Sequence, residues 1–157
     1  MPVKLLISGQ PNSGKTTLLK TLDPTTTLVI SRDDKKFGLP LPHKTIVDFD
    51  DALNLQTQIE EAVAAYSEKF GNPPETIVID SISKILLDIE ARVLKKVKSF
   101  PYGVVNTEIA ALTEFLEKDI APYCNIIFIS HTIFNTETNN YELVNAGGSW
   151  GKKGGML

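Results

Sequence analysis

One stretch decides the fold class of this 157-residue chain: Gly9-Gln10-Pro11-Asn12-Ser13-Gly14-Lys15-Thr16. It matches the pattern G-x-x-x-x-G-K-[ST] without a departure, which is roughly a one-in-a-few-hundred chance event in a chain of this length. The apolar run Val3 to Ser8 ahead of it is typical of a strand covered on both faces of a parallel sheet. Lys15 to Leu22 behind it has a helical pattern that stops before a proline. Together these features predict a phosphate-binding loop between a strand and a helix.

The residue types of this loop indicate a nucleotide with bound magnesium. We expect the backbone from Gly9 to Thr17 to surround the phosphates and Lys15 to reach the terminal ones. The Thr16 hydroxyl is a magnesium ligand in this pattern, and Asp80, at the end of the apolar run 76–80, is expected to hold the same ion through water. Judged alone, Asp80 is a weaker candidate, because an acid at the end of an apolar strand is often a helix cap, here for residues 81–84.

The nucleotide is predicted to be ATP. A GTPase needs a guanine-selecting N-K-x-D segment and D-x-x-G after the metal strand, whereas Asp80 is followed by Ser-Ile-Ser.

Strand and helix patterns alternate along the rest of the chain. Further strands are predicted at 27–31, 44–49, 76–80 and 125–130, and helices at 52–70, from 81 through 98, and from about 107 to 121. This alternation predicts an α/β fold, in which a mainly parallel sheet is flanked by helices on both faces. The carboxyl ends of the strands then share one edge, where ligands bind.

Composition indicates a single compact domain with 42% hydrophobic residues. Residues 1–131 are predicted to form the ATPase core, and residues 132–157 a polar, glycine-rich loop or tail. The net charge of -3 gives no overall attraction to nucleic acid. The lone Cys124 is predicted to be a buried thiol, and no run approaches the roughly 20 apolar residues of a membrane span, so we expect a cytoplasmic protein without a membrane partner.

Two polar residues follow other predicted strands. Asp33 comes after the strand 27–31, and His131 comes after the strand 125–130. Both are expected at the edge that holds the phosphates. A carboxylate there can act as the general base for an attacking water, and a polar side chain can sense the terminal phosphate. The alternatives are a solvated turn acid, with Asp34 as a competitor, and a surface or capping histidine.

The order of these parts resembles the RecA-type ATPase core, from Leu5 to about Gly155. The small phage-encoded RecA-like ATPases that accompany single-strand annealing and recombination look most similar, which implies the host cytoplasm as the location. The resemblance implies that Asp33 is the catalytic acid and His131 the γ-phosphate sensor, although the family more often has glutamate and glutamine there. The family core also continues into a further strand, whereas this chain ends at Leu157.

The resemblance also implies two loops that bind single-stranded DNA and self-association as a ring or filament with ATP near the subunit interface. The first loop falls at 95–106 and the second at 132–155. Lysines would contact phosphates and aromatic side chains would stack on bases. The candidates are Lys95, Lys96, Lys98 and Tyr102 in the first loop, and Trp150, Lys152 and Lys153 in the second. Alternatively, Lys152 or Lys153 completes a neighbour's ATP site, or the first group is a solvated helix end.

Two other functions remain open. A nucleotide-gated assembly protein with little hydrolysis fits the same loop, because Asp33 is shorter than glutamate. A small-molecule kinase shares the phosphate loop but clamps the transferred group with several arginines. The chain has only Arg32 and Arg92, so an arginine-rich lid is missing.

Overall fold

The structure is a computed structural model that describes residues 1–32, 39–144 and 146. Its elements follow in chain order: β1 (Lys4–Gly9), α1 (Lys15–Leu18), η1 (Leu19–Thr21), β2 (Thr27–Ser31), β3 (His43–Thr45), α2 (Ala52–Phe70), β4 (Thr76–Asp80), α3 (Ile82–Lys96), α4 (Pro101–Phe115), η2 (Leu116–Ile120), β5 (Asn125–Asn135) and β6 (Asn140–Leu143).

One sheet organises the chain, with the strand order β1-β5-β4-β2-β3 and β6 paired to β5. All neighbours are parallel except β5 and β6, so the predicted α/β fold with a mainly parallel sheet is confirmed. Strand β5 lies between the strand that leads into the phosphate loop and the strand that ends in Asp80. In the register, Gly9 is opposite His131 and Asp80 is opposite Ile129. The sheet therefore places the ends of β1 and β4 on either side of residues 129–131 of β5.

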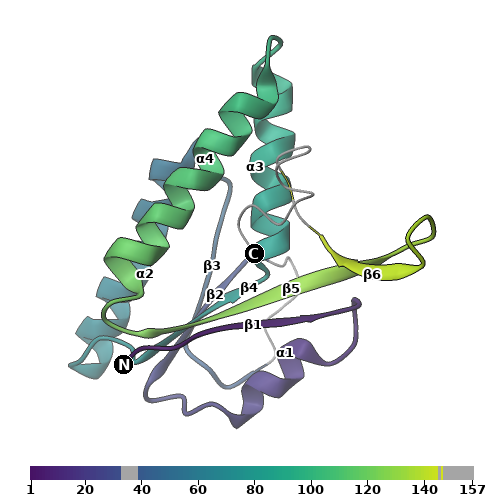
Figure 1. Cartoon of the computed structure of the whole chain (residues 1–157). Helices are drawn as coiled ribbons and strands as arrows, with labels where there is room; N and C mark the ends of the chain where they lie inside the picture. Colours follow the sequence, from purple (N-terminus) through teal and green to yellow (C-terminus); the bar gives the residue numbers. More distant parts are fainter. Residues whose placement is uncertain (33–38, 145, 147–157) are drawn as a thin grey trace.

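Helices cover both faces of the sheet, as predicted. On one face, α2, α3 and α4 pack against the strands (Figure 1) and bury a large apolar cluster that includes Leu55, Ile89 and Ile109. On the other face, Leu19 of η1 packs with Val29, Val78 and other buried residues of the sheet in a smaller cluster. Burial of these side chains is the main source of stability. Cys124 is buried as expected, and this burial raises the pKa of its thiol.

The prediction that β1 is covered on both faces is wrong. Among the described residues β1 is the last strand of the sheet and pairs with β5 alone. Leu5 and Leu6 retain 48% and 37% of their exposed surface. A continuous apolar run favours a central, buried strand, but it does not determine the position of that strand in the sheet order.

Several element bounds also differ from the sequence prediction. The helix after the phosphate loop becomes a 3-10 turn after Leu18, and the strand expected at 44–49 is only His43–Thr45. Helix α4 starts at Pro101, earlier than expected, because a proline at the first helical position needs no N–H partner. Helix α2 agrees with its prediction, with the Asp51 side chain as the N-terminal cap and Gly71 at φ +78° as the stop.

The polar segment after Thr132 begins as a β-hairpin. Strand β5 continues past Ser130 to Asn135, and β6 returns antiparallel to it, with Phe134 opposite Tyr141. Figure 1 shows this hairpin projecting beyond the end of β1. The loop expected from residue 132 therefore contains a strand pair up to Leu143.

One carboxylate ties the three large helices together. Glu108 Oε2 on α4 accepts hydrogen bonds from the backbone N of Ala52 at the start of α2 (2.7 Å) and from Arg92 Nη2 of α3 (2.9 Å). The Arg92 and Glu108 side chains are only 15% and 16% exposed. Removing one partner of such a pair leaves the other charge poorly solvated.

We therefore predict that Glu108→Ala lowers the free energy of unfolding by about 2 kcal/mol, below the value for fully buried pairs because some solvent reaches this one. Urea unfolding followed by circular dichroism measures the change. Glu114→Ala is the matched control, since Glu114 is exposed and pairs only with Lys118 one turn away among the described residues. Equal loss of stability in both variants would contradict the assignment.

Candidate nucleotide site

The phosphate loop has the backbone shape that its glycines predict. Gly14 has φ +85°, in the left-handed region that favours glycine, at the start of α1. At Gly9, a Cβ atom would lie 2.9 Å from the Ser13 Oγ atom, so a side chain has no room without a shift of Ser13. These two positions make the tight curl possible.

Lys15 is held inside this curl. Its side chain is 8% exposed, and its Nζ donates to the carbonyl oxygens of Gly9 (2.8 Å) and Gln10 (2.6 Å). Burial lowers the pKa of Lys15, and the charge of Asp80 opposes that shift. The ammonium group thus faces carbonyl oxygens that phosphate oxygens can replace, with the stronger attraction of a full negative charge.

Thr16 and Asp80 meet although they are 64 residues apart. The Thr16 hydroxyl donates to Asp80 Oδ2 at 2.9 Å, and Asp80 is 6% exposed. A hydroxyl and a carboxylate are hard oxygen ligands of the kind Mg²⁺ takes, beside phosphate oxygens and water. The two side chains therefore fit the magnesium ion that the sequence predicts.

His131 lies within β5 and not after its end as predicted, because the strand continues to Asn135, and it is opposite Gly9, the first glycine of the loop. Its backbone N donates to Ser83 Oγ at 3.2 Å, and Ser83 is fully buried near the start of α3. Ser81, the residue after Asp80, caps the same helix by accepting from Lys84 N at 3.3 Å. Hydrogen bonds at the start of α3 thus involve both His131 of β5 and Ser81, the residue after Asp80.

Some predicted site residues lie outside the described part of the chain. These are Asp33 of the proposed catalytic turn and Trp150, Lys152 and Lys153 of the second predicted DNA loop. Their roles stay predictions.

Arg32, which directly follows β2, forms a network of ion pairs and hydrogen bonds that the sequence patterns do not predict. Its backbone N donates to the Asp80 carbonyl oxygen at 2.8 Å. Its guanidinium group pairs with Asp88 of α3 (2.7 Å) and with Asp48 (3.1 Å). No local signal reveals these partners, because they are 56 and 16 residues away in the sequence.

The first predicted DNA segment forms the tip of the α3–α4 hairpin. Only residues 97–100 separate the two helices, so much of 95–106 is helical. The tip patch consists of five exposed side chains: Lys95, Lys96, Lys98, Phe100 and Tyr102. Phe100, absent from the sequence prediction, is 89% exposed and has φ +50°, a conformation that costs a non-glycine residue about 1 kcal/mol.

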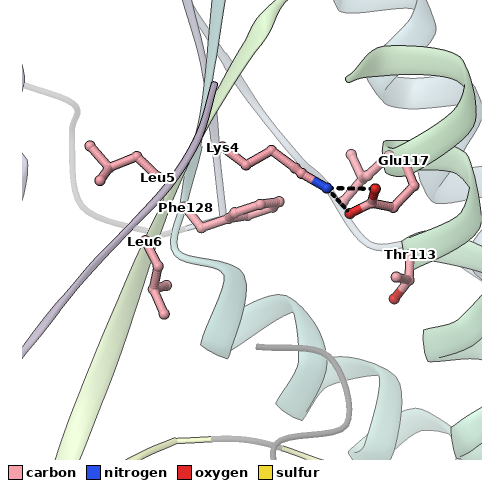
Figure 2. A pocket seen from close by; sticks show the side chains of 7 residues that line it. Lys4, Leu5, Leu6, Thr113, Glu117 and Phe128 are labelled. Carbon is pink, nitrogen blue, oxygen red and sulfur yellow. Dashed lines mark hydrogen bonds and ion pairs between the residues drawn. The ribbon is translucent and has the colours of Figure 1, made fainter. Parts of the chain in front are cut away.

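A hollow of about 210 Å³ lies elsewhere, between the start of β1 and the end of α4. Figure 2 shows Lys4 and Glu117 paired across it, with Leu6 and Phe128 on the sheet side. The hollow contains no residue of the phosphate loop. It does not belong to the nucleotide site.

The fold, the loop and the Thr16–Asp80 contact define a P-loop nucleotide-binding protein of the α/β class. Comparison with known protein families matches residues 1–147 to the AAA domain family. The chain therefore belongs to this family of P-loop ATPases. A comparison with curated proteins finds no match. Within the described residues, no helix has the length and apolar character needed to cross a membrane.

Proposed function

We propose that this protein binds and hydrolyses ATP with Mg²⁺ and uses the cycle to act on single-stranded DNA, in recombination or annealing of the phage type. The observation that carries the ATPase part is the 2.9 Å contact between Thr16 and Asp80 beside the buried Lys15. Membership of the AAA domain family supports nucleotide hydrolysis as the reaction class.

Each residue of the site has one part in the proposed reaction. The loop backbone and Lys15 bind and neutralise the terminal phosphates, and Thr16 and Asp80 hold Mg²⁺. When bound, Mg²⁺ withdraws charge from the phosphate oxygens. Asp33 takes a proton from the attacking water, and His131, beside Gly9 in the register, senses loss of the terminal phosphate.

The tip patch supports the DNA part of the proposal. Three lysines and two exposed aromatic rings lie within residues 95–102, and one of the lysines, Lys96, also pairs with Asp50 at 3.7 Å. Lysines suit the phosphates of a single strand and aromatic rings suit its bases. Helix α3 connects the patch to the nucleotide site: it begins two residues after Asp80 and has 15 residues, about 22 Å of rigid helix.

The arginines weigh against a small-molecule kinase. Arg32 pairs with Asp48 and Asp88, and Arg92 pairs with Glu108 and lies over the Phe49 ring. Both are therefore engaged within the domain, whereas a kinase lid needs arginines directed at the transferred phosphate. A nucleotide-gated assembly protein would bind ATP at the same site but hydrolyse little of it. The rate of ATP hydrolysis therefore distinguishes that function from the proposed one.

The steady-state ATPase rate of the purified chain, with and without single-stranded DNA at low salt, tests the proposal. We expect a Mg²⁺-dependent rate that DNA increases. A rate indifferent to DNA would overturn the DNA part alone. Tight ATP binding without turnover would leave the assembly protein as the function.

Removing the tip lysines should weaken DNA binding through lost phosphate contacts. For the triple variant Lys95→Ala, Lys96→Ala, Lys98→Ala we predict a salt dependence of log Kd that is shallower by about 0.7 per lost contact, so about 2 in all. Fluorescence anisotropy with a labelled oligonucleotide over a salt series measures this slope.

The control removes the same charge elsewhere, with Lys20→Ala, Lys69→Ala and Lys118→Ala combined. These lysines are exposed and distant from the tip in the sequence. If the control lowers the slope as much as the tip variant, DNA binding reflects overall charge and the tip patch is not its site.

A further inference from the structure

The phosphate loop is tied to the β5–β6 hairpin through Gln10. Its side-chain Nε2 donates to the hydroxyl of Tyr141 on β6 at 2.9 Å. The backbone carbonyl of the same residue accepts from Lys15 Nζ at 2.6 Å. A single loop residue therefore contacts both the ammonium group that reaches for phosphate and a strand 131 residues further along the chain.

The β5–β6 hairpin is stabilised by few contacts, so one additional hydrogen bond can change how often it opens. Strand β6 pairs with β5 over four residue pairs, from Thr132 opposite Leu143 to Asn135 opposite Asn140. The Phe134 and Tyr141 rings meet edge to face at 5.2 Å between centroids, but both side chains are about half exposed. A two-stranded ribbon with little buried area is marginally stable, so an added tie shifts its opening equilibrium measurably.

We propose that Tyr141 is a positioning residue of the phosphate loop, and that the Gln10–Tyr141 hydrogen bond couples nucleotide binding to the order of the hairpin. The proposal rests on the nucleotide-binding function proposed above. Phosphate oxygens compete with the Gly9 and Gln10 carbonyls for Lys15, and the loop N–H groups close on the phosphate. When phosphate has already ordered the loop, formation of the Gln10–Tyr141 hydrogen bond costs less conformational entropy. Nucleotide binding and formation of this bond therefore favour each other.

Reciprocity makes the coupling measurable from both sides. If bound nucleotide lowers the equilibrium constant for hairpin opening by a given factor, the Gln10–Tyr141 bond lowers the Kd for nucleotide by the same factor. One hydrogen bond between neutral groups corresponds to a factor of about 2 to 10.

The test uses the full chain as wild type and as Tyr141→Phe, which keeps the ring that packs on Phe134 and removes only the hydroxyl. Hydrogen exchange of residues 132–143 is measured with and without a non-hydrolysable ATP analogue and Mg²⁺, and the analogue's Kd is measured separately. We expect the analogue to slow hairpin exchange about 2- to 10-fold in the wild type and not in the variant. The variant should bind the analogue weaker by the same factor.

Two further variants assign the effect to this bond. Tyr123→Phe is the control, because Tyr123 is 82% exposed and lies outside the site. It should behave as the wild type does. In the Gln10→Ala background, Tyr141→Phe should change neither measurement, since the bond between the two side chains is already absent there.

Two results would overturn the proposal in different ways. If the wild type binds the analogue and the hairpin responds equally in wild type and Tyr141→Phe, the coupling through Tyr141 is refuted and the nucleotide site stands. If the wild type binds no nucleotide, the proposed function fails and the coupling falls with it.

Discussion

Lys15→Ala will lower the ATPase rate at least about a hundredfold, the loss that follows when an electrostatic contact to the developing charge is removed. In the structure this ammonium group is buried and held by the Gly9 and Gln10 carbonyls. The loop's curl depends on its glycines, so the variant should remain folded. A coupled-enzyme assay of phosphate release, with thermal unfolding as the fold check, measures the effect.

Lys20→Ala is the matched control for that variant. Lys20 lies a few residues further along, in η1, and its side chain is exposed. The control should keep the wild-type rate and melting temperature. Equal rates in wild type, Lys15→Ala and Lys20→Ala would show that any turnover arises outside this loop.

Asp80→Asn should lower the ATPase rate by a comparable factor, because it weakens magnesium binding. The amide oxygen can still accept the Thr16 hydroxyl, so the 2.9 Å contact can persist while the negative charge is lost. A neutral amide holds a hydrated magnesium ion less strongly than a carboxylate does. We expect a roughly hundredfold lower ATPase rate and a much higher Mg²⁺ concentration for half-maximal activity.

Measuring the ATPase rate over a series of Mg²⁺ concentrations distinguishes weakened magnesium binding from a general folding defect. Asp119→Asn serves as its control, because Asp119 is exposed on η2 at the far end of α4 from the tip patch. An unaltered magnesium requirement in Asp80→Asn would exclude Asp80 as the metal carboxylate.

Local sequence patterns predicted the parts of the site that depend on local structure. The glycines and Lys15 lie within eight residues of one another, so the loop can be recognised from the chain alone. Asp80 ends a short apolar strand, and parallel sheets bring such ends to one edge, so its closeness to Thr16 also follows. The long helix α2 has a capping aspartate, apolar spacing and a glycine stop.

Features that depend on distant partners were not predictable in this way. The exposure of Leu5 and Leu6 results from the position of β1 in the strand order, which the apolar run does not encode. The same holds for the ion pair of Arg32 with Asp88 and for the bond between Gln10 and Tyr141, which join residues 56 and 131 positions apart.

The hairpin was missed for a different reason. Its strands, Asn125–Asn135 and Asn140–Leu143, contain polar residues such as Thr132, Glu142 and several asparagines, which are also frequent in loops. Strand pairing and the aromatic contact of Phe134 with Tyr141 override that local preference.

Calorimetric titration of the chain with a non-hydrolysable ATP analogue, with and without Mg²⁺, tests the central claim most directly. We predict one site per chain, tighter binding when Mg²⁺ is present, and no measurable binding by Lys15→Ala. An undiminished affinity in Lys15→Ala, or a folded wild type that binds no analogue, would contradict it.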